Sequence, residues 1–236
     1  TLSSSSAASD VYKRQLSKHI QNKKKKKVLL IQNKALELSL FLSLPASVAL
    51  LIASEQIISA LFGYGQFDQI SVYNSAKALY FFSLGLPAFA MIKVFSNFFF
   101  ANHDTKTPFY ISLLSVLLNI MISVYYFNLI GFIIIPIATT VSSWFNVCVL
   151  FVFLKKERLF SFNKIFILRF FKITFSSILM GIFFNYLILI FDDQLAFNYL
   201  FKFFYLILSV FLGLCFYLIT SLWIKAFQLK DIKLRY

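Results

Sequence analysis

The sequence predicts an all-α protein, a polytopic transmembrane helix bundle with about six spans. Of its 236 residues, 60% are hydrophobic, 32 are phenylalanine and only 14% are charged, whereas soluble domains are nearer a quarter charged. Apolar stretches recur along the chain at lengths that can cross a bilayer, for which about 20 residues are needed. The alternating pattern of barrel strands is absent, so each span must satisfy its backbone hydrogen bonds as a helix.

The chain begins with two segments that differ from the rest. Residues 1–15 are serine-rich and share no pattern with the later residues, so we interpret them as a non-native or disordered scar. Residues 16–34 form a basic cytoplasmic segment whose lysine block stands directly before an apolar stretch. Such a block is a candidate for contact with anionic lipid headgroups, worth about 1 kcal/mol per residue; the alternative is a plain solvated segment. The block consists of Lys23, Lys24, Lys25, Lys26 and Lys27.

Six apolar stretches are predicted to span the membrane. Four of them fall within residues 35–158, and the last two, with a C-terminal tail, fall within residues 159–236. The predicted spans are residues 35–61, 72–101, 108–127, 132–154, 165–191 and 199–224.

The basic residues indicate the orientation of these spans. If the chain crosses six times, most of its 23 Lys and Arg residues fall on one side, and the opposite connections carry Asp68, Asp192 and Asp193. Cytoplasmic loops are enriched in Lys and Arg, so both ends of the chain are predicted to be cytoplasmic. In so apolar a chain, this charge indicates loops at a membrane surface and not nucleic-acid binding.

Polar residues inside the spans are the candidates for contact with a substrate. Lys93 is the costliest, at about 2.5–3.5 kcal/mol for a central lysine, and Ser96 and Asn97 share its helix face. This favours a water-accessible cavity in which Lys93 meets an anionic group; the alternative is that its stem reaches the headgroups. Asn119, in the third span, either lines the same cavity or hydrogen-bonds a neighbouring helix.

Prolines interrupt three of the spans. Pro45, Pro87 and Pro136 each remove a backbone donor and bend the helix, and Gly85 precedes the second of them. We predict these residues as hinge candidates, as in transporters with broken helices. Static packing, with the freed carbonyl satisfied by a neighbour, is the alternative.

The sequence offers no catalytic constellation. His19 and His103 are its two histidines, and the carboxylate pair Asp192 and Asp193 has no histidine or cysteine near it. Metal-ligand spacings, glycine-rich phosphate loops and nucleophile motifs are missing. We therefore predict no enzyme, no cofactor and no metal.

Four motifs, taken in order at their spacing, resemble the bacterial lipid II flippase family (MurJ/MviN) of the multidrug/oligosaccharidyl-lipid/polysaccharide exporter superfamily. They are LPA at 44–46, LFGYGQF at 61–67, GLPAFAMIKV at 85–94 and DTKTP at 104–108. In the last, Asp104, Lys106, Thr107 and Pro108 form a cytoplasmic loop motif. The resemblance covers residues 16–158 well and the later spans by position and hydropathy.

The resemblance implies the C-terminal half of a two-lobe flippase in the bacterial inner membrane, which translocates undecaprenyl-linked peptidoglycan precursor by alternating access. Its expected partners are membrane lipids, that precursor and the first lobe, and the last two spans are expected to form a groove for the lipid tail. The family's essential arginines and acidic residues lie upstream of residue 16, so we expect a fragment that cannot flip lipid alone. An exporter of another polyprenyl-linked saccharide and a membrane scaffold that binds anionic lipid stay open as alternatives.

Overall fold

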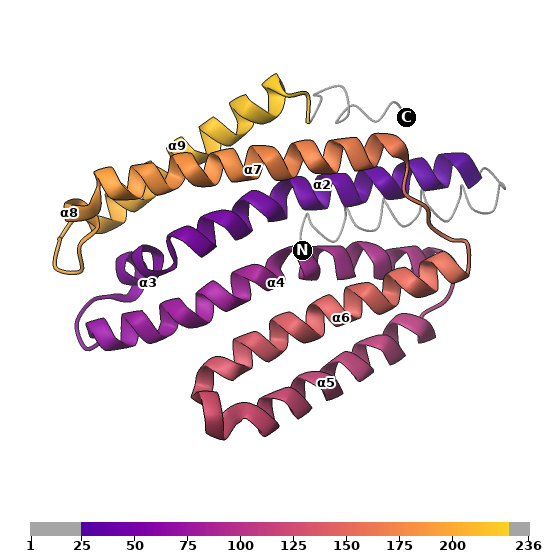
Figure 1. Ribbon diagram of the computed structural model, residues 1–236, viewed down its shortest axis with the longest axis horizontal. Helices are drawn as coiled ribbons and strands as arrows, with labels where there is room; N and C mark the ends of the chain where they lie inside the picture. Colours follow the sequence, from indigo (N-terminus) through magenta and orange to yellow (C-terminus); the bar gives the residue numbers. More distant parts are fainter. Residues whose placement is uncertain (1–24, 227–236) are drawn as a thin grey trace, which may run out of the picture.

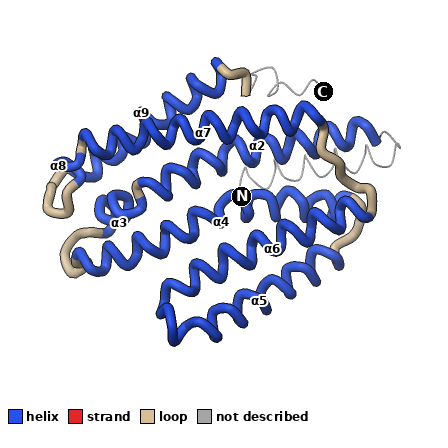
Figure 2. Tube along the Cα trace, viewed as in Figure 1, coloured by secondary structure: helices blue, strands red, loops and turns tan. Residues whose placement is uncertain are grey.

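The computed structural model describes residues 25–226, and all regular elements in that range are helices (Figure 2). Six of them are longer than the about 20 residues needed to cross a bilayer. These are α2 (Lys25–Ile52), α4 (Gln69–Ala101), α5 (Lys106–Ile130), α6 (Ile134–Lys156), α7 (Lys164–Ile190) and α9 (Lys202–Trp223). The short elements are α3 (Ser54–Phe62), the 3-10 helix η1 (Gly131–Ile133) and α8 (Asp192–Leu195). The predicted all-α fold class is confirmed.

The long helices pack as neighbours in the order α9, α7, α2, α4, α6, α5, which Figure 1 shows from top to bottom. Helix α7 therefore returns to pack beside α2, far from it in the chain. Each inner helix has covered flanks and open faces, and large apolar side chains such as Leu42, Val124 and Leu168 are more than half exposed. In a membrane, lipid tails or another protein segment can cover such faces without loss of hydrophobic stabilisation.

The connections gather at the two ends of the bundle (Figure 1). What we call the basic end, at the right of the figure, holds the start of α2 and the α4–α5 and α6–α7 connections, with Lys106 and Arg158. The acidic end, at the left, holds α3, η1 and α8, with Glu55, Asp192 and Asp193. This separation of charge agrees with the alternation of charge along the sequence, while the orientation itself stays a prediction.

A tight turn separates the third and fourth predicted spans. The helical run Lys106–Lys156 is 51 residues long and apolar, more than twice what one crossing requires. Its middle is the 3-10 turn η1, where Gly131 has φ of 72°, a left-handed conformation that glycine adopts without steric cost. The chain reverses there, and α5 and α6 lie side by side as two separate helices (Figure 1).

The prediction of one continuous span over residues 35–61 is wrong. Helix α2 starts earlier, at Lys25, and ends at Ile52, after which α3 forms a separate helix. The break is at Ala53, which is fully buried and has φ of −111° and ψ of 25°. Hydropathy does not detect it, because the residues on both sides are apolar. Lys25, Lys26 and Lys27 form the start of α2, whereas Lys23, Lys24 and residues 1–15 lie outside the described residues.

Phenylalanines fill the core near the basic end. Phe95, Phe98 and Phe99 of α4 are fully buried. Phe160 of the α6–α7 connection packs against two of them, with ring centroids 5.9 Å from Phe95 and 5.6 Å from Phe98. This contact fixes one face of α4 inside the bundle and leaves its opposite face open.

Candidate functional site

The open face of α4 carries the polar residues that the sequence singled out. Lys93 is exposed, and Ser96 and Asn97 are half-buried, on the side away from the fully buried Phe95 and Phe98. Among the described residues, Lys93 has no hydrogen bond or ion pair. An unpaired lysine inside a span is costly unless water, a headgroup or an anionic group meets it. The predicted polar face is therefore present, and its role in substrate binding stays a prediction.

Asn119 lies in a different helix interface, between α5 and α6. Its Nδ2 donates to Thr139 Oγ1 at 3.0 Å and to Ser142 Oγ at 3.3 Å, and its Oδ1 accepts from Ser123 Oγ at 3.5 Å. The structure thus brings Asn119 together with α6 hydroxyls and not with Lys93. These bonds hold the α5–α6 pair together, the interhelical role considered from the sequence.

Two of the predicted hinge prolines lie opposite hydroxyl groups of neighbouring helices. Pro45 cannot donate to Phe41 O, and Tyr217 Oη of α9 donates to that carbonyl at 2.8 Å. Pro87 cannot donate to Ser83 O, and Ser47 Oγ of α2 donates to it at 2.6 Å. Since a proline leaves the carbonyl four residues earlier without its helical partner, each hydroxyl supplies a donor in place of the missing helical N–H. We call these two bonded positions the proline notches.

Gly85 and Pro136 mark the contact between α4 and α6. Both are buried, and a Cβ on Gly85 would lie 3.0 Å from Thr140 Oγ1 of α6. The Thr140 hydroxyl donates to Phe81 O at 2.7 Å, and Trp144 Nε1 donates to Leu84 O at 3.0 Å. Glycine therefore permits the close approach of α6 to the α4 backbone beside the second proline notch. A hinge role for these residues stays a prediction.

The loop motif forms the amino-terminal cap of α5. Asp104 Oδ1 accepts from the backbone N–H groups of Lys106 and Thr107, each at 3.0 Å, and Pro108 is buried in the first turn, where its missing N–H costs nothing. Hydrogen bonding by the Thr107 side chain, with help from these backbone N–H groups, lowers the pKa of Asp104. The motif thus has a local structural role, which is to start α5.

One buried ion pair and one buried lysine escaped sequence reasoning, which counted Arg169 and Lys202 with the charges at the membrane surface. Glu37 of α2 forms an ion pair with Arg169 of α7 at 2.8 Å, with side chains 7% and 19% exposed. Lys202, at the start of α9, is 1% exposed, and its Nζ donates to Gly63 O at 2.8 Å and to Phe197 O at 2.7 Å. A buried charge needs a partner, so Glu37 inside an apolar stretch was the available signal. The partner lies 132 positions away, which a single sequence does not reveal.

The described residues contain no group of three or more His, Cys, Asp and Glu side chains that could hold a metal ion. The polar groups near the open face of α4 are a cation, an amide and a hydroxyl. They can bind an anion by charge and hydrogen bonds, and they include no nucleophile paired with a base.

Comparisons with known proteins agree with the resemblance carried by the motifs. Residues 14–211 match the family described as "Lipid II flippase MurJ". Proteins named "Probable lipid II flippase MurJ" are similar: that of Rhizobium meliloti is 40% identical over 121 residues, or 51% of this chain and 23% of the relative. That of Thermotoga maritima is 38% identical over 143 residues, or 61% of this chain and 28% of the relative.

A solved structure titled "Lipid II flippase MurJ, inward closed conformation" has the same fold. It aligns with a TM-score of 0.70 at 28% sequence identity, covering 90% of this chain and 41% of that chain. The alignments thus cover about a quarter of the curated relatives and less than half of the solved one.

Proposed function

Because the chain belongs to the lipid II flippase MurJ family, we propose that it forms the second lobe of a transporter that moves undecaprenyl-linked peptidoglycan precursor across the bacterial inner membrane. The observation that carries this proposal is that one alignment to a flippase structure extends over nearly the whole chain. Membrane lipids and the first lobe are the partners of this half, and transport proceeds by alternating access of the two lobes.

Lys93 supplies the positive charge for this function. It is exposed on the open face of α4, unpaired among the described residues, with Ser96 and Asn97 beside it. A cation in a partly desolvated site attracts a pyrophosphate or a neighbouring carboxylate strongly. The ammonium group holds that anion in one state of the cycle and releases it when the lobes rock apart.

The proline notches supply the flexibility. At Pro45 and Pro87 the helices α2 and α4 lack one internal hydrogen bond and depend on a hydroxyl from a neighbouring helix. A side-chain hydroxyl can exchange partners more readily than a helical N–H, so these positions can bend without breaking the backbone ladder.

Replacing Lys93 by Met in this chain, reconstituted together with the first lobe of a relative, tests the role of the charge. We expect Lys93→Met to reduce lipid II flipping in proteoliposomes by about tenfold or more, equivalent to about 1.4 kcal/mol of lost interaction, and Lys93→Arg to retain more activity. The matched control is Lys77→Met on the same helix, where Nζ lies 4.1 Å from the Tyr73 ring centroid. Unchanged flipping and unchanged growth of flippase-depleted cells with Lys93→Met would leave Lys93 as a headgroup contact.

The two-lobe proposal has its own test in flippase-depleted cells. The chain alone is expected to fail to restore growth. Co-expression with the first lobe of a relative is expected to restore it in part, because the open faces of the six long helices then have a partner. Growth supported by the chain alone would contradict this proposal.

A further inference from the structure

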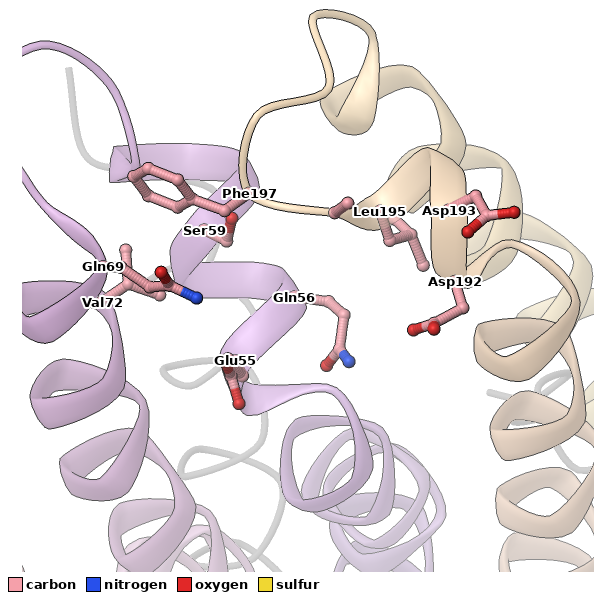
Figure 3. Close-up of a pocket in the computed structure, with 10 residues that line it drawn as sticks. Glu55, Gln56, Ser59, Gln69, Val72, Asp192, Asp193, Leu195 and Phe197 are labelled. Carbon is pink, nitrogen blue, oxygen red and sulfur yellow. The ribbon is translucent and has the colours of Figure 1, made fainter.

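A cavity of about 300 Å³ lies at the acidic end, between α3, the start of α4 and α8 (Figure 3). It is distant from the open face of α4 around Lys93, which lies toward the basic end. Val72, Leu195 and Phe197 form its apolar part. Its polar lining consists of Glu55, Gln56, Ser59, Gln69, Asp192 and Asp193.

The cavity concentrates negative charge in a chain of net charge +14. It holds three of the nine acidic residues, and no Lys or Arg lines it. Glu55, Asp192 and Asp193 make no ion pair or hydrogen bond to any described residue. In Figure 3 the Asp192 carboxylate extends toward Gln56 across the space between α8 and α3, while that of Asp193 points away from α3. Such a field favours a cation over any other ligand.

Ser59 provides an independent indication of a ligand. It lines the cavity, is 4% exposed, and its Oγ has no hydrogen-bond partner among the described residues. Among the other buried helical serines, Ser177 and Ser209 donate to the carbonyl four residues earlier, whereas Ser43 and Ser176 are unpaired as Ser59 is but do not line the cavity. Leaving a buried hydroxyl unpaired costs about 1–3 kcal/mol. Its oxygen is therefore available to accept from a bound donor.

The spacing of the lining groups defines the chemical class of that donor. No three His, Cys, Asp or Glu side chains of the described residues come close enough to share a metal ion, so the lining does not suit a bare divalent cation. A primary ammonium group carries three donors, which match the carboxylates, the amide oxygens and the unpaired hydroxyl of the lining. The Lys202 ammonium already lies 4.7 Å from the Phe197 ring centroid, so the carboxylates of the lining, and not this ring, are the groups that attract a further cation.

We propose that the cavity at the acidic end binds a primary ammonium group about the size of ethanolamine. Its place in the fold favours the headgroup of an aminophospholipid, because exposed Tyr64, Tyr73 and Tyr199 belong to the connections and the start of α4 at the same acidic end, and tyrosines concentrate at the headgroup level of membranes. A free primary amine has the same chemistry and is the second possible source. This site does not depend on the proposed transport function.

Lipid retention by the purified full chain tests the proposal. The chain is extracted from vesicles that contain equal amounts of phosphatidylethanolamine and phosphatidylcholine, and native mass spectrometry counts the lipids that stay bound. We expect a preference of about tenfold for phosphatidylethanolamine, since trimethylation removes all three donors. The triple variant Glu55→Gln, Asp192→Asn, Asp193→Asn is expected to lose that preference. Glu157→Gln, an exposed acidic residue at the basic end, is the matched control and is expected to keep it.

Ethanolamine and choline distinguish the two sources. If ethanolamine displaces bound phosphatidylethanolamine and choline does not, the site binds the lipid headgroup. If ethanolamine protects the cysteine of Ser59→Cys from a thiol reagent and the chain shows no lipid preference, the site binds a soluble amine. The proposal is overturned if both lipids are retained equally and ethanolamine does not protect Ser59→Cys. It is also overturned if the triple variant, with the same size-exclusion elution volume as the unaltered chain, keeps the full preference for phosphatidylethanolamine.

Discussion

Lys202 shows how a single buried charge can tie together distant parts of the chain. Its ammonium reaches Gly63 O at the α3–α4 corner and Phe197 O before α9, and it lies 4.4 Å from the Tyr64 ring centroid. Gly63 itself cannot be larger, since a Cβ there would lie 2.6 Å from Ser59 O. The lysine thus compensates its burial with two carbonyl acceptors and an aromatic face.

Lys202→Met is accordingly expected to destabilise the protein. It removes two charge-assisted hydrogen bonds and leaves two carbonyls unpaired, a loss of about 1.5–3 kcal/mol for each bond to a charged group. Thermal unfolding in detergent measures the effect as a lower midpoint. Lys77→Met loses only a half-exposed cation–π contact, so it is expected to change the midpoint little. An equal drop of the midpoint in both variants would contradict the stabilising role of Lys202.

Asp104 gives a pH-dependent prediction. Its pKa is lowered in the folded chain, so the carboxylate stabilises the fold at pH above the unfolded value of 3.8, and this contribution disappears as the pH falls through the folded pKa. Asp104→Ala is expected to lower the unfolding free energy by about 1 kcal/mol at neutral pH, the usual value of such a cap. Unfolding of both chains from pH 7 to 3 should show the difference shrinking. Asp104→Asn, which keeps an acceptor, should retain most of the stability without the pH dependence.

At the scale of helices, the proline notches join three of the long helices, α9, α2 and α4. Tyr217 of α9 bonds to α2 at Pro45, and Ser47 of α2 bonds to α4 at Pro87. Ser47→Ala is expected to cost about 1–3 kcal/mol, because Ser83 O then loses its donor in an apolar environment. Tyr217→Phe is expected to lower stability by removing the hydroxyl that donates to Phe41 O. Reversible unfolding in mixed micelles provides the measurement.

The matched control for Ser47→Ala is Ser115→Ala. Ser115 is also buried, but it donates to Ile111 O, a carbonyl four residues earlier that faces no proline. That carbonyl keeps its helical N–H when the hydroxyl is removed, so little stability should be lost. A similar cost for both serines would mean that proline position has no bearing on these bonds.

At the scale of the whole molecule, local hydropathy predicted the long helices, because each must be apolar over its own length. It failed at Ala53, where the chain bends between two equally apolar segments. It also failed at pairings such as Glu37 with Arg169, because the partner of a buried charge is chosen by the packing of α2 on α7 and not by neighbouring residues. Of the predicted site, the polar face of α4 followed from helical periodicity, while the position of Asn119 against α6 required the folded chain.

The orientation of the bundle is the remaining prediction at this scale. The basic end carries Lys106 and Arg158 and the acidic end carries Asp192 and Asp193, so the positive-inside rule places the basic end in the cytoplasm. After Cys148 and Cys215 are replaced by Ala, a cysteine at Gln66, which is exposed beyond α3, should react with an impermeant maleimide in spheroplasts. A cysteine at Glu157 should react with the maleimide only after the spheroplasts are lysed. The reverse pattern, or labelling of both positions before lysis, would show that charge does not set the topology of this chain.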